Sequence, residues 1–98
     1  MNLNLKITPT AGKTLTELKE DPGKNKDYQA VKKAIVFLSR NPRYPGLQTH
    51  IFYSIKGPSG QKIFEAYAQQ NTPSAYRIFF YDGPHKKDIT IFAIIPHP

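Results

Sequence analysis

Cysteine is absent from the 98 residues, which excludes disulfide bonds, thiolate metal sites and thiol nucleophiles. Long apolar runs are absent as well. No run is longer than that over residues 91–95, which is far short of the ~20 residues that a membrane-spanning helix needs. The N-terminal residues carry no signal-peptide pattern. These absences are typical of a protein of the reducing cytoplasm, and we expect neither a membrane partner nor a disulfide framework.

Acidic residues are scarce. Seven Asp and Glu stand against fourteen Lys and Arg, so the formal net charge is +7. Residues 1–27 are nearly balanced, with five lysines against four acids, whereas residues 28–98 carry nine basic residues against three acids. A surface of this kind attracts RNA, DNA or an acidic protein segment. Charge alone equally fits a solubilising surface, so it does not decide among these partners.

The composition supports one modest hydrophobic core. The hydrophobic fraction is 39% and the aromatic fraction is 12%, which is too apolar for a disordered chain. A chain of this length buries roughly 60–70% of its unfolded surface on folding. We therefore expect a single domain over residues 1–98.

The chain opens with patterns of a strand and a helix. Residues 3–8 alternate apolar and polar side chains, which predicts a short, half-buried strand. Residues 8–23 favour a helix, with Thr8 or Thr10 as its N-terminal cap. The sequence DPG at 21–23 ends it.

A second helix is indicated more clearly. Apolar residues recur at helical spacing between Tyr28 and Leu38, with lysines on the opposite side. Asp27 is the expected N-terminal cap of this helix. Asn41 precedes Pro42, which disfavours the helical conformation and predicts that the helix ends there.

The rest of the chain has the composition of a sheet. Successive strands joined by short links predict an antiparallel meander, and two helices placed before it cover only one of its faces. The predicted fold class is α+β, in the order β-α-α-β-β-β-β, with two helices packed on one face of an antiparallel twisted sheet. The other sheet face is expected to be at least partly open. The four predicted strands are rich in β-branched and aromatic residues and cover residues 47–57, 61–69, 76–82 and 88–95.

Strand alternation predicts which side chains share the open face. The charged residues Glu65 and Arg77 should avoid the helix-covered core, and Tyr67, Phe79 and Tyr81 have the same parity as these two. Cations interleaved with aromatic rings suit single-stranded nucleic acid. The alternative is a second small core with a cross-strand Glu65–Arg77 ion pair, and parity leaves both interpretations open.

Four segments of the second half together resemble a known family. NPRYPGLQTH, IFEAYA, AYRIFFYDGP and ITIFAIIPHP, in this order and spacing, resemble the RelE-like branch of the RelE/ParE superfamily, which are toxins of bacterial toxin–antitoxin pairs. The resemblance covers nearly the whole chain and implies the same fold. It also implies a small basic cytoplasmic protein that an antitoxin covers and blocks. RelE-type members cut mRNA in the ribosomal A site without a metal ion, whereas ParE-type members inhibit DNA gyrase.

The resemblance also implies roles for individual residues. Arg77 matches the family's arginine that contacts the scissile phosphate, and a guanidinium can grip two phosphate oxygens. His97 matches the position near the C-terminus where a histidine or tyrosine acts as general acid or stacks on the substrate. The general base stays open between Glu65, the one carboxylate in the interior of the meander's strands, and His50. Each of these residues also has a purely structural interpretation. Arg77 could form a surface salt bridge, His97 could be a loose chain end, and Glu65 and His50 could make ordinary contacts between strands.

The resemblance leads us to expect several cations in the cleft, but the chain has few. Arg43 and the lysines Lys56 and Lys62, which flank the GPSG turn, are the candidate phosphate contacts, with Tyr67, Phe79 and Tyr81 as the candidate stacking residues. The lysines equally fit a solvated hairpin tip. No HxH or HExxH spacing appears, so we expect no metal site and no cofactor.

The sequence therefore favours a RelE-like toxin that cleaves mRNA, most readily on the ribosome, and that an acidic antitoxin segment neutralises. Two alternatives stay open. One is a ParE-like gyrase inhibitor, for which His97 is unnecessary. The other is a catalytically inactive protein with the same fold that only binds an antitoxin. The small number of arginines favours weak cleavage or a site that the ribosome completes.

Overall fold

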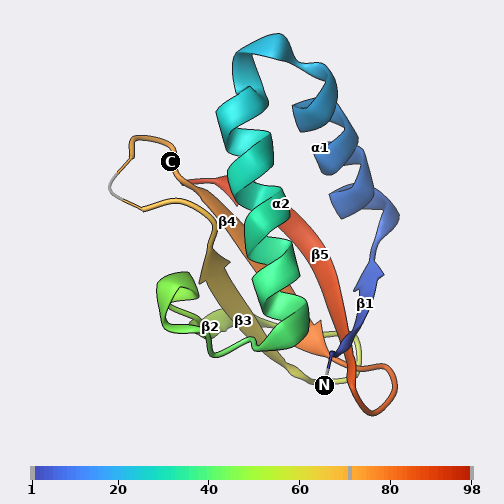
Figure 1. The fold of residues 1–98 in the computed structure, drawn as a ribbon. Coiled ribbons are helices and arrows are strands. Elements are labelled where there is room, and N and C mark those ends of the chain that lie inside the picture. Colours follow the sequence, from blue (N-terminus) through green and yellow to red (C-terminus); the bar gives the residue numbers. More distant parts are fainter. Residues whose placement is uncertain (1, 71, 98) are drawn as a thin grey trace.

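Figure 1 shows the arrangement of the chain in the computed structural model, which describes residues 2–70 and 72–97. Two helices lie on one side of a five-stranded sheet. Short 3-10 turns, η1 and η2, follow α1 and α2 in the chain. The elements in chain order are β1 (Asn4–Ile7), α1 (Pro9–Glu20), η1 (Pro22–Lys24), α2 (Asn25–Arg40), η2 (Pro45–Leu47), β2 (His50–Lys56), β3 (Lys62–Tyr67), β4 (Tyr76–Asp82) and β5 (Asp88–Pro96).

The sheet has the strand order β1-β5-β4-β3-β2. The last four strands form the predicted antiparallel meander. β1 joins the outer edge of β5 in parallel, so the complete sheet is mixed and not wholly antiparallel. The helices carry the chain from β1 to β2 at the opposite edge of the sheet, and the three reversals of the meander then bring β5 back parallel to β1. The alternation within residues 3–8 predicts a strand but does not indicate that this strand pairs with β5.

α1 has the N-terminal cap that its sequence suggests. The Thr8 side-chain oxygen accepts a hydrogen bond from the backbone N–H of Ala11, which decides between the two threonines. Asp21 follows the last helical residue and caps η1 through the backbone N–H of Gly23. Within the described residues, neither this helix nor α2 is long and apolar enough to cross a membrane.

The start of α2 differs from the prediction. The helix begins at Asn25, and Asp27 lies inside its first turn, so the assignment of Asp27 as the cap is wrong. The Asp27 carboxylate instead accepts a hydrogen bond from Gln69 Nε2 at 2.8 Å, a contact between residues 42 positions apart. A negative charge in the first turn still complements the helix dipole. The helix ends as expected, with Asn41 in an extended conformation before Pro42.

The core lies between the two helices and the sheet, where α2 packs over β4 and α1 packs over β5 (Figure 1). The helices contribute apolar residues spaced three or four apart, and the strands contribute every second residue, as each periodicity requires. Fourteen buried residues form this core: Ala11, Leu18, Val31, Ala34, Ile35, Leu38, Leu47, Ala66, Tyr76, Ile78, Phe80, Ile89, Ile91 and Ile94.

β5 contains a bulge that changes which of its side chains face the helices. Phe79 pairs with Ala93 and Phe80 pairs with Ile91, so Phe92 is the additional residue. Ile91 and Ile94 therefore both lie in the core, although they are three residues apart. The Phe92 ring packs on the opposite face against Tyr81, with ring centroids 5.8 Å apart.

Candidate catalytic and nucleic-acid-binding face

The sheet face away from the helices carries a second small core. Ile63 and Phe79 are buried, and the Phe79 ring contacts Phe52 edge-on with centroids 5.1 Å apart. Phe79 also lies 6.3 Å from the Phe92 ring. The expectation that Phe79 is exposed on an open face is wrong, because four aromatic rings gather here and exclude water. The alternative of a second small core describes this region better.

Beside this second core, one carboxylate holds two basic side chains. Glu65 Oε2 accepts a hydrogen bond from Arg77 Nη1 at 2.5 Å, and Glu65 Oε1 lies 2.7 Å from His50 Nε2. The Glu65 side chain is 5% exposed and Arg77 is 15% exposed, whereas His50 is 49% exposed. The cross-strand Glu65–Arg77 pair, one of the two interpretations of the sequence, is thus present. His50 joins it because it lies directly opposite Glu65 across β2 and β3.

His50 uses both of its ring nitrogens. Nδ1 lies 2.9 Å from the backbone carbonyl oxygen of Gln48, which only accepts, so Nδ1 carries a hydrogen and donates it. Nε2 lies within hydrogen-bond distance of Glu65 Oε1. His50 and Glu65 therefore form a hydrogen-bonded pair whose orientation is fixed by a backbone carbonyl.

Sequence reasoning missed the contribution of Gln48. Its backbone adopts a left-handed conformation, with φ 47° and ψ 42°, directly after η2. This conformation is uncommon for a residue with a side chain. Because the contact to His50 is made by a main-chain oxygen, the identity of residue 48 gives no direct signal for it.

The guanidinium of Arg77 is only partly satisfied. Nη1 binds Glu65, but Nε is buried without a hydrogen-bond partner among the described residues. The Arg77 guanidinium carbon lies 5.2 Å from the centre of the Phe79 ring, within the range of a cation–π contact. The second small core thus forms one wall of the arginine site.

Tyr67 connects this polar cluster to a cleft. It lies directly opposite Arg77 on the neighbouring strand, and its ring centroid is 5.8 Å from that of His50. Tyr67 also lines a mostly polar cleft of about 460 Å³ at the end of the sheet where the β3–β4 loop and the C-terminus meet. The other lining residues include Gln48, Gln69, Ser74 and His97.

His97 continues the path of β5 for one more residue. Its backbone N–H donates to the carbonyl of Ala75 at 2.8 Å, which extends the pairing of β4 and β5. Ile95 lies directly opposite Arg77, so His97 is two residues, or about 7 Å of strand, beyond the arginine. The exposed His97 side chain lines the same cleft as Tyr67. Pro96 precedes this histidine, and Pro98, which follows it, lies outside the described residues.

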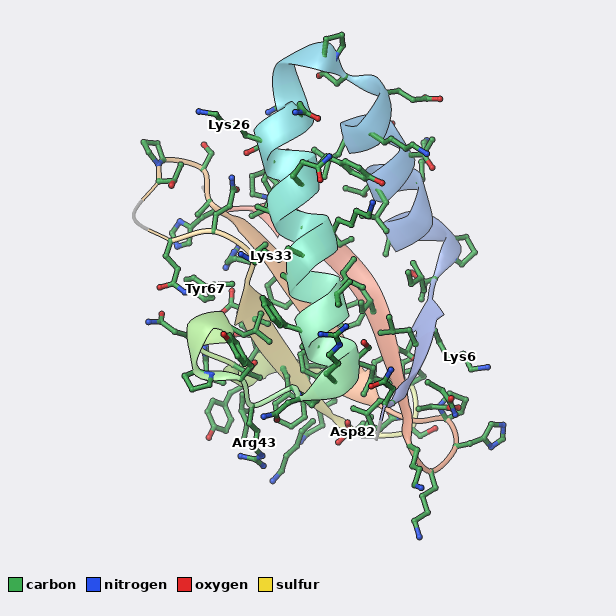
Figure 2. All side chains as sticks on the ribbon, viewed as in Figure 1. Lys6, Lys26, Lys33, Arg43, Tyr67 and Asp82 are labelled. Carbon is green, nitrogen blue, oxygen red and sulfur yellow. The ribbon has the colours of Figure 1, made fainter. Side chains whose placement is uncertain are left out.

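The remaining candidates for nucleic-acid contact lie away from this cluster. Lys56 and Lys62 are exposed and directly opposite each other at the tip of the β2–β3 hairpin. Figure 2 shows Arg43 projecting from the end of the molecule below η2, where it lines a cleft of about 350 Å³ that His50 also borders. Tyr81 is half-buried against Phe92. The structure thus groups Arg77, Glu65, His50, Tyr67 and His97, and spreads the cations around them.

The described part of the chain contains no group of three or more His, Asp and Glu side chains that could hold a metal ion. The polar cluster has one carboxylate and one imidazole, with a guanidinium as the third member. An arginine repels a metal cation, so the chemistry of this donor set suits an anionic ligand.

The comparison with solved structures identifies the architecture. One match is described as the crystal structure of the archaeal RelE–RelB complex from Pyrococcus horikoshii OT3. It has a TM-score of 0.67 at 18% identity and covers 98% of this chain and 96% of that chain. The fold is RelE-like. No family model matches the chain, and neither does any curated protein sequence. The likeness covers nearly the whole length of both chains.

Proposed function

We propose that this protein is a RelE-like toxin that cleaves mRNA, most readily on the ribosome, and that an antitoxin with an acidic segment neutralises it. The observation that carries the proposal is the row Tyr67–Arg77–Ile95 across β3, β4 and β5. Arg77 lies in this row, Glu65 lies two residues before Tyr67 on β3 and is bound to His50, and His97 lies two residues beyond Ile95. A guanidinium, a carboxylate–imidazole pair and a second histidine are therefore available in one region of the sheet. The RelE-like fold and the net charge of +7 support the same assignment.

The proposed reaction is cleavage through the ribose 2′-hydroxyl without a metal ion. The 2′-oxygen attacks the adjacent phosphorus, its proton passes to a general base, and the bond from phosphorus to the 5′-oxygen breaks. The leaving 5′-oxygen takes a proton from a general acid, which leaves a 2′,3′-cyclic phosphate and a 5′-hydroxyl. Arg77 stabilises the charge on the phosphate, and His97 in the cleft is the general acid.

Glu65 is the better candidate for the general base, and His50 acts through it. Both ring nitrogens of His50 are already engaged, by the Gln48 carbonyl and by Glu65. A carboxylate, by contrast, has about four lone-pair positions, and Oε2 becomes available once Arg77 releases it. His50 then holds the carboxylate in place.

The test is induced expression in bacterial cells with mapping of mRNA ends. Wild-type protein should produce new mRNA ends, and His97→Ala should reduce their formation by roughly 100-fold or more, the usual contribution of a general acid. His85→Ala is the matched control, because His85 is also exposed but lies in the β4–β5 turn. Equal cleavage by the two variants would remove His97 from the mechanism.

One observation favours the inactive alternative. Arg77 and Glu65 bind each other in a nearly buried pair, which is also what a purely structural ion pair does. An inactive antitoxin-binding protein would leave growth and mRNA ends unchanged on overexpression while still binding an acidic antitoxin segment. Wild-type cleavage that His97→Ala abolishes would exclude this alternative.

A further inference from the structure

Two groups that the proposed reaction needs are engaged with each other. Arg77 has to contact the scissile phosphate, but its Nη1 is bound to Glu65, which is 5% exposed. A phosphate that approaches Arg77 in this arrangement also approaches a carboxylate, and like charges at close range repel each other. RNA therefore cannot bind Arg77 fully while Glu65 keeps its present contact.

We propose that Glu65 is a resident anion that occupies Arg77 in place of the substrate phosphate, and that RNA binding exchanges one for the other. This inference rests on the proposed function, since it concerns the same site. Glu65 then has a regulatory role in binding that is separate from its role as base: it weakens the affinity for phosphate until a correctly placed substrate displaces it.

The partial satisfaction of Arg77 supports the exchange. Nε is buried without a partner among the described residues, while Glu65 uses a single oxygen on Nη1. A phosphate can accept two parallel hydrogen bonds from the Nη1 and Nη2 edge of the guanidinium, where Glu65 now engages Nη1 with a single oxygen. The contact to the Phe79 ring holds the guanidinium in place during the exchange.

His50 gives the displaced carboxylate a place to stay. Oε1 of Glu65 remains on His50 Nε2, which is itself held through the Gln48 carbonyl. Displacement from Arg77 therefore frees Oε2 alone, and this oxygen can then accept the 2′-hydroxyl proton. The phosphate that binds Arg77 therefore also releases Glu65 Oε2 to act as the base.

The experiment measures binding separately from cleavage. The probe is a short single-stranded RNA with methylated 2′-hydroxyls, which cannot be cleaved, and its binding is followed by fluorescence anisotropy. Glu65→Gln removes the competing charge, and we expect binding about tenfold tighter, the value of one charge-assisted contact. The plot of log affinity against log salt should steepen by about 0.7, the increment for one additional phosphate contact on a single strand.

Two variants provide the controls. Asp82→Asn removes one negative charge from an exposed position on the same strand, so it reports the general effect of charge. Glu65→Gln/Arg77→Gln tests whether the gain depends on Arg77, and in this double variant the gain should disappear. A purely structural role for Glu65 would instead weaken binding in the single variant. Equal affinities of Glu65→Gln and Asp82→Asn, or a gain that survives without Arg77, would refute the exchange.

A measurement on the wild-type protein tests the exchange without relying on the folding of any variant. The NMR signals of the Arg77 guanidinium should move when the methylated RNA is added, because Nη1 changes its partner, and unchanged signals would refute the exchange. Cleavage of unmodified RNA is read independently. Tighter binding by Glu65→Gln without cleavage by wild type refutes the nuclease and supports the exchange. Wild-type cleavage without tighter RNA binding by Glu65→Gln supports the nuclease and refutes the exchange.

Discussion

Arg77 is the residue whose removal should cost the most stability among the charged side chains. It leaves Glu65, which is 5% exposed, with only the imidazole as a partner. We expect Arg77→Ala to lower the free energy of unfolding by about 3–5 kcal/mol, because the nearly buried carboxylate loses its guanidinium partner. Urea denaturation measures this loss. The exposed Arg43 is the control, and Arg43→Ala should change stability by less than about 0.5 kcal/mol.

The double variant Glu65→Leu/Arg77→Met distinguishes the stability that the ion pair contributes from the cost of leaving one buried charge unpaired. Replacing both partners of a buried ion pair by apolar side chains is often neutral. We expect this variant to be more stable than Arg77→Ala alone. A loss in the double variant equal to that of the single one would show that the ion pair itself stabilises the fold.

Thr8 should matter to α1 as an element. Its side chain caps the helix through the N–H of Ala11, whereas Thr10 is an exposed residue inside the first turn. Thr8→Ala should lower the free energy of unfolding by about 1 kcal/mol, since one helix N–H loses its partner. Thr10→Ala should have no such cost, because alanine has the higher helix propensity. Thermal unfolding of the two variants makes the comparison, and equal effects would contradict the assignment of the cap.

Some features of the helices and strands could be predicted from local sequence patterns and others could not. The strand over residues 76–82 and the end of α2 before Pro42 follow from residues that neighbour each other in the chain. The start of α2 does not, because Asp27 is drawn to Gln69, which tertiary packing brings near. The bulge at Phe92 is equally hidden, since residues 91–95 are all apolar and their sequence carries no alternation that could mark the additional residue.

The charge of the whole molecule predicts strong salt dependence of RNA binding. If Arg43, Lys56 and Lys62 each neutralise a phosphate, raising salt from ~50 to ~200 mM should weaken binding of the methylated RNA roughly twentyfold. Lys56→Gln/Lys62→Gln should reduce the salt slope by about 1.4. Lys6→Gln/Lys26→Gln removes the same charge from β1 and α2, where Figure 2 shows both lysines pointing outward. Equal slopes for the two double variants would place the RNA elsewhere.

The sequence by itself determined the order of the elements, the faces of β3 and β4, and the residues that are available for chemistry, because these depend on side-chain periodicity and composition. Tertiary structure decided how those residues are used. Residues 12 and 15 positions apart had to meet before Glu65 engaged Arg77 and His50 together. Only the packing of four aromatic rings buried Phe79, and only the backbone at Gln48 fixed the imidazole. Contacts of this kind join residues that are distant in the chain, so they depend on the complete fold and cannot be inferred from local sequence patterns.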